Sequence, residues 1–110
     1  DDLPRLSGPP EQAAQVLAMY RQLKPLVEPL DMELAVLELS ARGGWRMELD
    51  NGAAVELGGG TAEEVAARLA RFVQTLTQVA GRYGRTPLAL ESADLRHADG
   101  YALRLRGARL

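Results

Sequence analysis

Arginine side chains gather near the C-terminal end of the chain, on and beside a predicted β-strand. They are Arg96, Arg104, Arg106 and Arg109. A guanidinium group binds a carboxylate through two parallel hydrogen bonds, and a strand with no later segment beside it can pair with an added peptide. These residues therefore predict a site for an extended acidic peptide. The alternative is that the arginines only protect an open sheet edge from aggregation.

Other residue types in the chain offer little for catalysis. His97 is the only histidine, and it follows Asp94 by three residues, so on a strand the two side chains point to opposite faces and cannot form a simple dyad. The glycines before Thr61 could bind an anion at a helix N-terminus, but Glu63 and Glu64 already occupy that end of the helix dipole. The chain has no cysteine and no clustered metal ligands. We therefore expect no enzymatic activity, no cofactor and no metal.

The composition is that of one ordinary globular domain. With 110 residues the chain is large enough for a single hydrophobic core and too small for two. The 13 basic and 15 acidic residues give a formal net charge of −2, and this near balance argues against a nucleic-acid partner. No apolar run reaches the roughly 20 residues that span a bilayer, and no signal sequence begins the chain. We interpret it as a soluble domain excised from a longer protein.

Two amphipathic helices are predicted. In the first, over Glu11–Leu23, apolar residues recur at helical spacing. Because Pro25 removes a backbone donor, the helix should end or kink near Leu23. The second begins with a capping box, in which Thr61 is followed by Glu64 three residues later. Its apolar stripe consists of Val65, Leu69, Phe72, Val73, Leu76 and Val79. We expect this stripe to pack against the apolar face of a sheet.

The middle of the chain predicts strands. Residues 32–41 alternate as one long strand with a bulge after Val36. Residues 45–57 predict a hairpin with a three-residue loop that ends at Gly52 in a left-handed conformation. The expected pairs are Trp45 with Leu57, Met47 with Val55, Leu49 with Ala53 and, on the other face, Arg46 with Glu56. This register is favoured because it places the apolar side chains on one face.

The C-terminal segment, residues 94–105, predicts a second hairpin of the same kind. Its three-residue loop would end at Gly100. The expected pairs are His97 with Tyr101, Leu95 with Leu103, Ala93 with Leu105, Arg96 with Ala102 and Asp94 with Arg104. One face of this hairpin is apolar and the other is charged.

These elements together predict the fold class. In chain order they are a helix, a long strand, a hairpin, a helix and a hairpin. We expect an α+β two-layer sandwich, in which a mostly antiparallel sheet of hairpins is covered on one face by the two amphipathic helices.

Several short motifs resemble the periplasmic β-domain of the bacterial FtsQ/DivIB family of cell-division proteins. In order they are LPRLSGP, VLAMYRQL, ARGGWRMELDNG, VELGGG, RLARF and DLRHADGYALR. Their order and spacing match together from Leu3 to Leu105. The resemblance implies that residues 1–110 form one domain of a longer protein, whose cytoplasmic tail, transmembrane helix and POTRA domain lie outside this sequence.

The resemblance also implies a function and a location. The protein would be a non-enzymatic scaffold of the divisome, anchored by one span in the bacterial inner membrane, with this domain in the periplasm during septation. Its partners would be FtsB and FtsL, and its last strand would accept a strand of FtsB. The implied partner-binding residues are Arg42, Arg96, His97, Asp99, Gly100, Tyr101, Ala102, Leu103, Arg104 and Leu105. The alternatives are a periplasmic or secretory adaptor that binds another acidic extended peptide, and a small hydrolase or binding enzyme.

Overall fold

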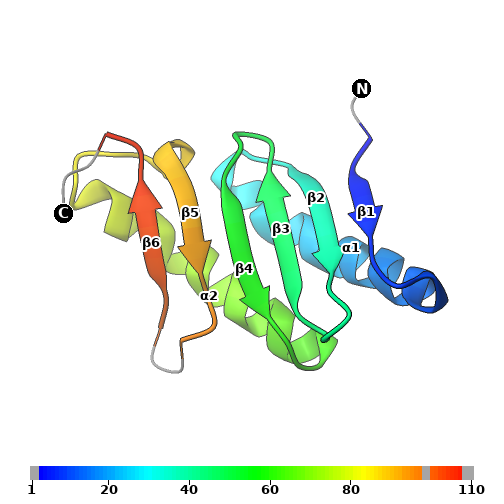
Figure 1. Ribbon diagram of the computed structural model, residues 1–110. Helices are drawn as coiled ribbons and strands as arrows, with labels where there is room; N and C mark the ends of the chain where they lie inside the picture. The colour runs from blue at the N-terminus through cyan, green and yellow to red at the C-terminus, as the bar shows by residue number, and fades with distance from the viewer. Residues whose placement is uncertain (1–2, 98–99, 108–110) are drawn as a thin grey trace.

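The computed structural model describes residues 3–97 and 100–107. Within them the fold is α+β, with one six-stranded sheet and two α-helices. The strands are β1 (Arg5–Ser7), β2 (Leu34–Leu39), β3 (Trp45–Leu49), β4 (Ala54–Gly58), β5 (Leu90–Asp94) and β6 (Ala102–Leu105). The helices are α1 (Ala13–Val27) and α2 (Ala62–Gly81), with short 3₁₀ turns at Pro10–Gln12, Glu28–Leu30 and Pro87–Ala89. The strands lie side by side in chain order (Figure 1).

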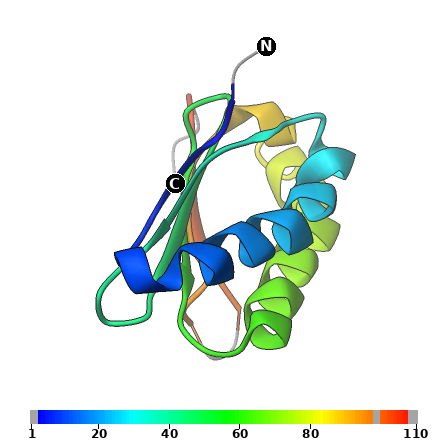
Figure 2. The ribbon, with the colours of Figure 1, turned by 90° about the vertical axis from the view of Figure 1, so that its right-hand side faces the viewer.

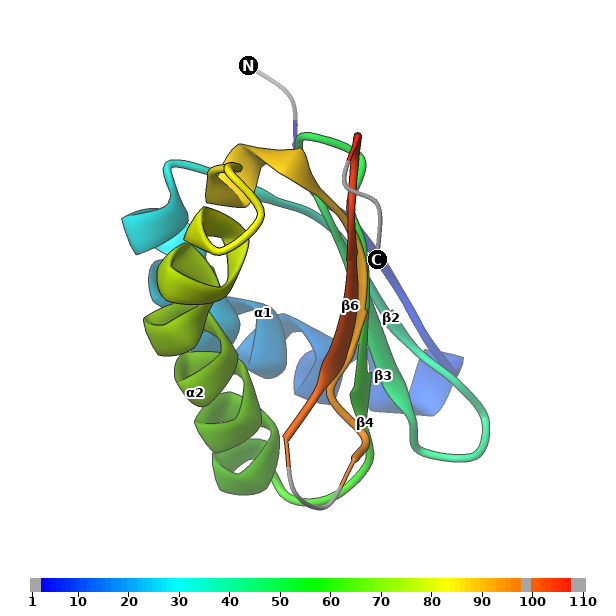
Figure 3. The ribbon, with the colours of Figure 1, turned by 90° about the vertical axis from the view of Figure 1, so that its left-hand side faces the viewer.

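Both helices pack on the same face of the sheet. Figures 2 and 3 show this helix layer from two sides, and on the opposite face the described residues include no covering helix. The core lies between the layers, where Trp45 and Met47 from the sheet and Phe72 and Leu76 from α2 are at most 2% exposed. The predicted packing of the apolar stripe of the second helix against the apolar face of the sheet is confirmed.

The sheet is mixed, which corrects the expectation of a mostly antiparallel sheet. Three neighbouring pairs are antiparallel, but β1 runs parallel to β2 and β4 runs parallel to β5. Each parallel pair flanks a helix, because a parallel connection must carry the chain back across the sheet. The sequence did not predict β1, because a strand of three residues with one half-buried side chain between two exposed ones is too short to show a clear alternating pattern.

Helix α1 continues past Pro25 to Val27, so of the predicted end or kink near Leu23, the end is wrong. Both Leu23 and Val27 are 0% exposed. Burial of these side chains stabilises the last turn and offsets the backbone hydrogen bond that proline cannot make.

Helix α2 begins at the predicted capping box. The Thr61 hydroxyl accepts a hydrogen bond from the Glu64 N–H at 3.1 Å, and the Glu64 carboxylate accepts one from the Thr61 N–H at 2.8 Å. These bonds satisfy two backbone donors that a bare helix end leaves unpaired. At the other end Ala80 is buried and Val79 is only half-buried, so the apolar stripe turns by one residue in the last turn.

The Trp45 hairpin has the predicted loop and most of the predicted register. Met47 lies opposite Val55, and Gly52 has a φ of 90°, a left-handed conformation that glycine adopts without a steric penalty. A bulge next to β3 places Trp45 opposite Gly58 instead of Leu57. Both Trp45 and Leu57 still face the core.

The predicted bulge in β2 is present but begins earlier than expected. The irregularity lies between Leu34 and Val36, not after Val36. Val36 therefore lies opposite Glu48 and stays outside the main core cluster, whereas the next residue, Leu37, is in it. The two faces of β2 are thus set by the position of the extra residue.

The predicted register of the C-terminal hairpin is wrong by two residues. Asp94 pairs with Ala102, not with Arg104, and Ala93 pairs with Leu103, not with Leu105. The connection is longer than three residues because β5 ends at Asp94, and Ala98 and Asp99 of the predicted loop lie outside the described residues. Since a slip of two preserves the alternation, each side chain keeps its predicted face.

Candidate peptide-binding edge

Strand β6 forms one edge of the sheet. Among the described residues no strand pairs with its outer side. The side chains of Ala102 and Arg104 are exposed, that of Leu103 is half-buried and that of Leu105 is buried in the core. The strand therefore has one face held by the core and one face in solvent, and it keeps a free edge.

The direction of the main-chain groups of β6 follows from two hydrogen bonds. The Arg106 N–H donates to the Ala89 carbonyl at 2.7 Å, so it points toward β5. The Leu95 N–H donates to the Glu56 carbonyl at 2.9 Å, which directs the main-chain groups of Asp94 toward β6. Main-chain groups alternate along a strand. Ala102 and Arg104 therefore face β5, and the N–H and C=O groups of Leu103 and Leu105 face the open edge.

Tyr101 attaches the beginning of β6 to helix α2. Its ring meets the Phe72 ring edge-on, with 4.8 Å between centroids. Its hydroxyl forms a hydrogen bond with the Thr75 hydroxyl. An edge-on aromatic pair adds to the stabilisation from burial. Of the predicted partner-binding residues, Tyr101 is thus half-buried and supports the strand from the helix side.

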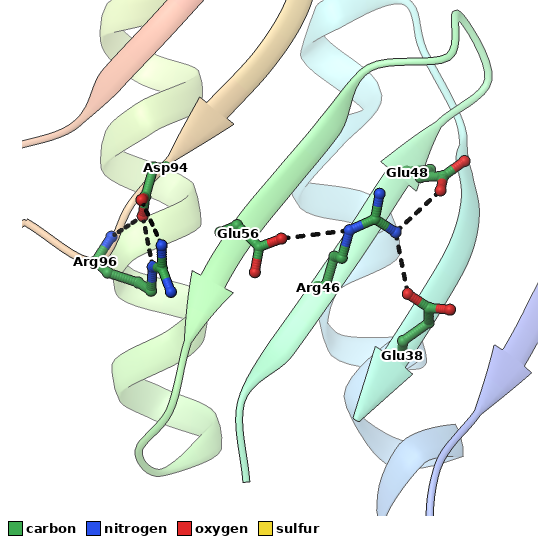
Figure 4. A network of polar contacts seen from close by, with 6 residues as sticks. All are labelled: Glu38, Arg46, Glu48, Glu56, Asp94 and Arg96. Atoms are coloured by element: carbon green, nitrogen blue, oxygen red, sulfur yellow. Dashed lines mark hydrogen bonds and ion pairs between the residues drawn. The ribbon is translucent and has the colours of Figure 1, made fainter. Parts of the chain in front are cut away.

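Arg96 lies beyond the end of β5, where Asp94 holds it. The Nε and Nη2 atoms of Arg96 donate to the two carboxylate oxygens of Asp94 at 2.9 and 2.7 Å, and the Arg96 main-chain N–H donates to the same carboxylate at 3.0 Å (Figure 4). The side chain of Arg96 is still 60% exposed. These hydrogen bonds, first from the side chain and then from the backbone, lower the pKa of Asp94 to about 2.

This interaction predicts a loss of stability in acid. The pKa of Asp94 is lower in the folded protein than its ordinary value near 3.8, so the contribution of Asp94 is present above about pH 4 and is lost as the pH falls toward 2. We expect the wild type to be more stable than Asp94→Asn at pH 6, and the difference in melting temperature to shrink by more than half at pH 2. Thermal melts of both proteins at pH 6, 4 and 2 test this. A difference that does not change with pH would contradict it.

Arg42 and Arg96 line the same hollow, although 54 residues separate them in the chain. The hollow has a volume of about 600 Å³ and lies where β2, β3 and β4 meet their connecting loops. Gly43, Gly44, Gly58 and Gly59 form part of its wall together with Trp45, and the lining also includes Glu38, Glu56 and Arg46, which belong to one ion-pair network. A Cβ atom at Gly58 would lie only 3.1 Å from Arg96 Cγ, so the glycine allows this arginine to approach. Two arginines at one hollow are suited to bind a carboxylate.

The three C-terminal arginines that the structure describes, Arg96, Arg104 and Arg106, do not gather at one site, which corrects the sequence interpretation. Arg96 lies at the glycine-lined hollow, whereas Arg106 donates from Nη2 to the Asn51 carbonyl at 2.9 Å, at the opposite end of β3. Arg104 stands between them on the face away from the helices. Arg109 lies outside the described residues, as does the predicted site residue Asp99. The structure therefore separates the predicted site into a strand edge and a hollow.

Two further predicted site residues lie at the helix end of the β6 connection. His97 and Gly100 border a small hollow together with Tyr101 and two arginines of α2. The His97 side chain is exposed, and the Gly100 N–H donates weakly to the His97 carbonyl at 3.5 Å. These residues connect the strand edge to α2 and lie away from Arg42.

Sequence reasoning predicted only one contact of the Arg46 network on the uncovered face. Arg46 Nη1 donates to Glu38 and to Glu48 at 3.0 Å each, and Nε lies 3.3 Å from Glu56 (Figure 4). The hydrogen bond to Glu48 is the first cause of a raised pKa at Arg46. The hairpin register predicted the contact of Arg46 with Glu56. The contact with Glu38 depends on the pairing of β2 with β3, and the contact with Glu48 depends on the two side chains lying on the same face of β3.

In the part of the chain that the structure describes, no three His, Asp or Glu side chains are placed to bind a metal ion together. Neither described helix combines the length and the apolar character needed to cross a membrane.

Residues 1–96 match the family model described as Cell division protein FtsQ/DivIB, C-terminal. The chain belongs to the FtsQ/DivIB family. The matched residues include α1, α2 and β1 to β5, and they end at Arg96 of the hollow.

Curated FtsQ proteins cover the remainder of the chain as well. The Cell division protein FtsQ of Thiomonas arsenitoxydans is 37% identical over 98% of this chain and 39% of its own length. The FtsQ protein of Xanthomonas campestris is 34% identical over 94% of this chain and 35% of its own length. The FtsQ protein of Burkholderia pseudomallei is 34% identical over 98% of this chain and 42% of its own length. The chain thus spans about two fifths of the length of these FtsQ relatives. It shares their family as a cell-division protein.

Proposed function

We propose that this domain is a non-enzymatic scaffold of the divisome that binds FtsB, within the FtsB and FtsL pair, by adding a strand of FtsB to β6. The observation that carries the proposal is the open edge of β6, where the main-chain groups of Leu103 and Leu105 face away from β5. A peptide strand gains affinity from such main-chain groups and specificity from alternate side-chain contacts. Membership of a family of cell-division proteins supports this choice of partner.

A second contact would form at the glycine-lined hollow. Arg42 is exposed there, and Asp94 holds the Arg96 guanidinium by Nε and Nη2, which leaves its Nη1 group for a partner. An acidic side chain of the partner would bind at this hollow through one or both arginines. We place the whole protein in the bacterial inner membrane with a single span and this domain in the periplasm. The second candidate is an adaptor that adds another acidic extended peptide to the same edge.

Charge reversal at Arg96 tests the proposal. Arg96→Glu is expected to weaken the binding of a peptide from the C-terminal part of FtsB by about 1.5 to 3 kcal/mol, the range for a charge-assisted hydrogen bond. The circular dichroism spectrum should change little, because Arg96 is largely exposed, and the melting temperature should fall about as far as in Asp94→Asn, because both variants lose the same ion pair. Isothermal titration calorimetry gives the affinity.

Arg21→Glu is the matched control, since Arg21 is exposed on α1 in the helix layer. It should bind the FtsB peptide as the wild type does. Equal affinity of folded Arg96→Glu, together with no shift of the β6 amide signals on titration, would leave the arginines as protection of an open edge. Binding of another envelope peptide but not of FtsB would favour the adaptor function.

A further inference from the structure

We infer that Arg104 selects the partner strand, which must place a carboxylate beside Arg104 on the uncovered face and apolar residues on either side of it. This inference rests on the proposed function and specifies the sequence that β6 accepts. It also implies that a second copy of the chain is a poor partner for this edge.

A row of side chains crosses the whole sheet. Neighbouring residues in the row are paired in the sheet register and share the face away from the helices. The row consists of Arg5, Val36, Glu48, Ala54, Ser92 and Arg104. An added strand would continue this row, and its residue next to Arg104 would lie on the same uncovered face.

Arg104 presents an exposed positive charge on the uncovered face. Its side chain is 73% exposed, and its nearest carboxylate is Glu91 at 3.9 Å. An exposed pair at this distance is weak, so the guanidinium remains able to bind a carboxylate from a partner. Because the main-chain groups of Arg104 face β5, an antiparallel partner residue opposite Arg104 belongs to a non-hydrogen-bonded pair. Such pairs bring the two Cα atoms to about 4.5 Å, the closer of the two spacings.

Leu103 and Leu105 flank Arg104 on β6 and determine which neighbours the partner residue should have. The N–H groups of Leu103 and Leu105 point to the partner, while their side chains lie on the helix side of the sheet. Leu105 is 3% exposed and Leu103 packs against the core. Partner residues beside them would lie at the rim of the same core, where apolar side chains are favoured. The accepted pattern is therefore apolar, acidic, apolar over three successive residues.

The charges at the two sheet edges disfavour pairing with a second copy of this chain. Both ends of the row carry arginine, because Arg5 lies on β1 at one sheet edge and Arg104 lies on β6 at the other. The described strand residues that face this side at the two edges are Arg5, Ser7, Ala102 and Arg104. None of these four carries a carboxylate. Pairing between copies would thus place arginine beside arginine or beside a neutral residue, and this disfavours self-association relative to an acidic partner.

A charge-swap experiment tests the inference. The probe is the peptide from the C-terminal part of FtsB, with each acidic residue in turn replaced by lysine. At one of these positions, the lysine substitution should lower the affinity of the peptide for the wild type about fivefold or more. Arg104→Glu should lower the affinity for the native peptide to a similar degree, because like charges in a cross-strand pair are destabilising. The combination of Arg104→Glu with that lysine peptide should recover most of the lost affinity.

Arg5→Glu is the matched control, because it reverses the same charge at the far end of the same row. It should bind all the peptides as the wild type does, and Arg104→Gln should bind the native peptide with intermediate affinity. If the native peptide binds but no position is rescued by Arg104→Glu, the inference about Arg104 is wrong while the proposed function stands. Rescue by Arg5→Glu would place the partner on β1 and overturn the inference. Failure of the native peptide to bind the wild type would instead refute the proposed function.

Discussion

Replacing Phe72 with alanine is expected to lower the free energy of unfolding by about 3 to 5 kcal/mol, the range for deleting a buried aromatic ring. Phe72 is 0% exposed and lies at the centre of the buried stripe of α2. Its ring also supports Tyr101, which joins β6 to the helix. The substitution therefore removes core packing and an edge-on aromatic contact together.

Urea denaturation followed by Trp45 fluorescence measures this effect, because Trp45 is 2% exposed and should emit as a buried indole until the domain unfolds. Phe72→Leu is the control that keeps most of the volume, and we expect it to cost less than half as much. Val79→Ala, at a half-buried position of the same helix, should cost less than about 1 kcal/mol. A loss below about 1.5 kcal/mol for Phe72→Ala would contradict the packing described for the core.

Proline at position 103 is expected to remove most of the affinity for the FtsB peptide while leaving the fold in place. The Leu103 N–H faces the open edge, so Leu103→Pro removes a donor to the partner and no donor to β5. A partner carbonyl left without its donor costs about 1 to 3 kcal/mol, and the proline ring adds a steric barrier to the approaching strand. We expect at least about a 30-fold loss of affinity.

Two matched variants separate the loss of the donor from the loss of the side chain. Leu103→Ala keeps the N–H and should retain most of the binding. Arg104→Pro removes a donor that faces β5, and we expect it to lower the melting temperature of the domain clearly more than Leu103→Pro does. Equal affinities of Leu103→Pro and Leu103→Ala would show that the partner does not pair with this edge.

The elements that sequence reasoning predicted correctly are those determined by short-range chemistry. Thr61 and Glu64 satisfy each other's backbone donors within one helical turn, so the start of α2 can be read from four residues. Gly52 supplies the left-handed residue that a three-residue loop needs, and the alternation on both sides then determines which residues pair. The apolar stripe of α2 and the basic character of β6 are equally local properties.

Predictions failed where a distant segment decided the outcome. The Leu95 N–H donates to the Glu56 carbonyl of β4, which turns the main-chain groups of Asp94 toward β6, and Asp94 pairs with Ala102 instead of Arg104. Burial of Leu23 and Val27 carries α1 past a proline for the same reason, since contacts with the rest of the core outweigh a local preference.

Local sequence patterns were enough to predict two amphipathic helices and a sheet with an arginine-bearing last strand, because helical and strand periodicity and capping act over a few residues. Its motifs also pointed to the FtsQ/DivIB family. The three-dimensional fold was needed to show that Arg42 and Arg96 share one hollow, that Arg106 lies at the other end of the sheet, and which main-chain groups of β6 face the open edge. These features depend on strand register and on parallel pairing across whole helices, and no local pattern specifies a contact between residues so far apart in the chain.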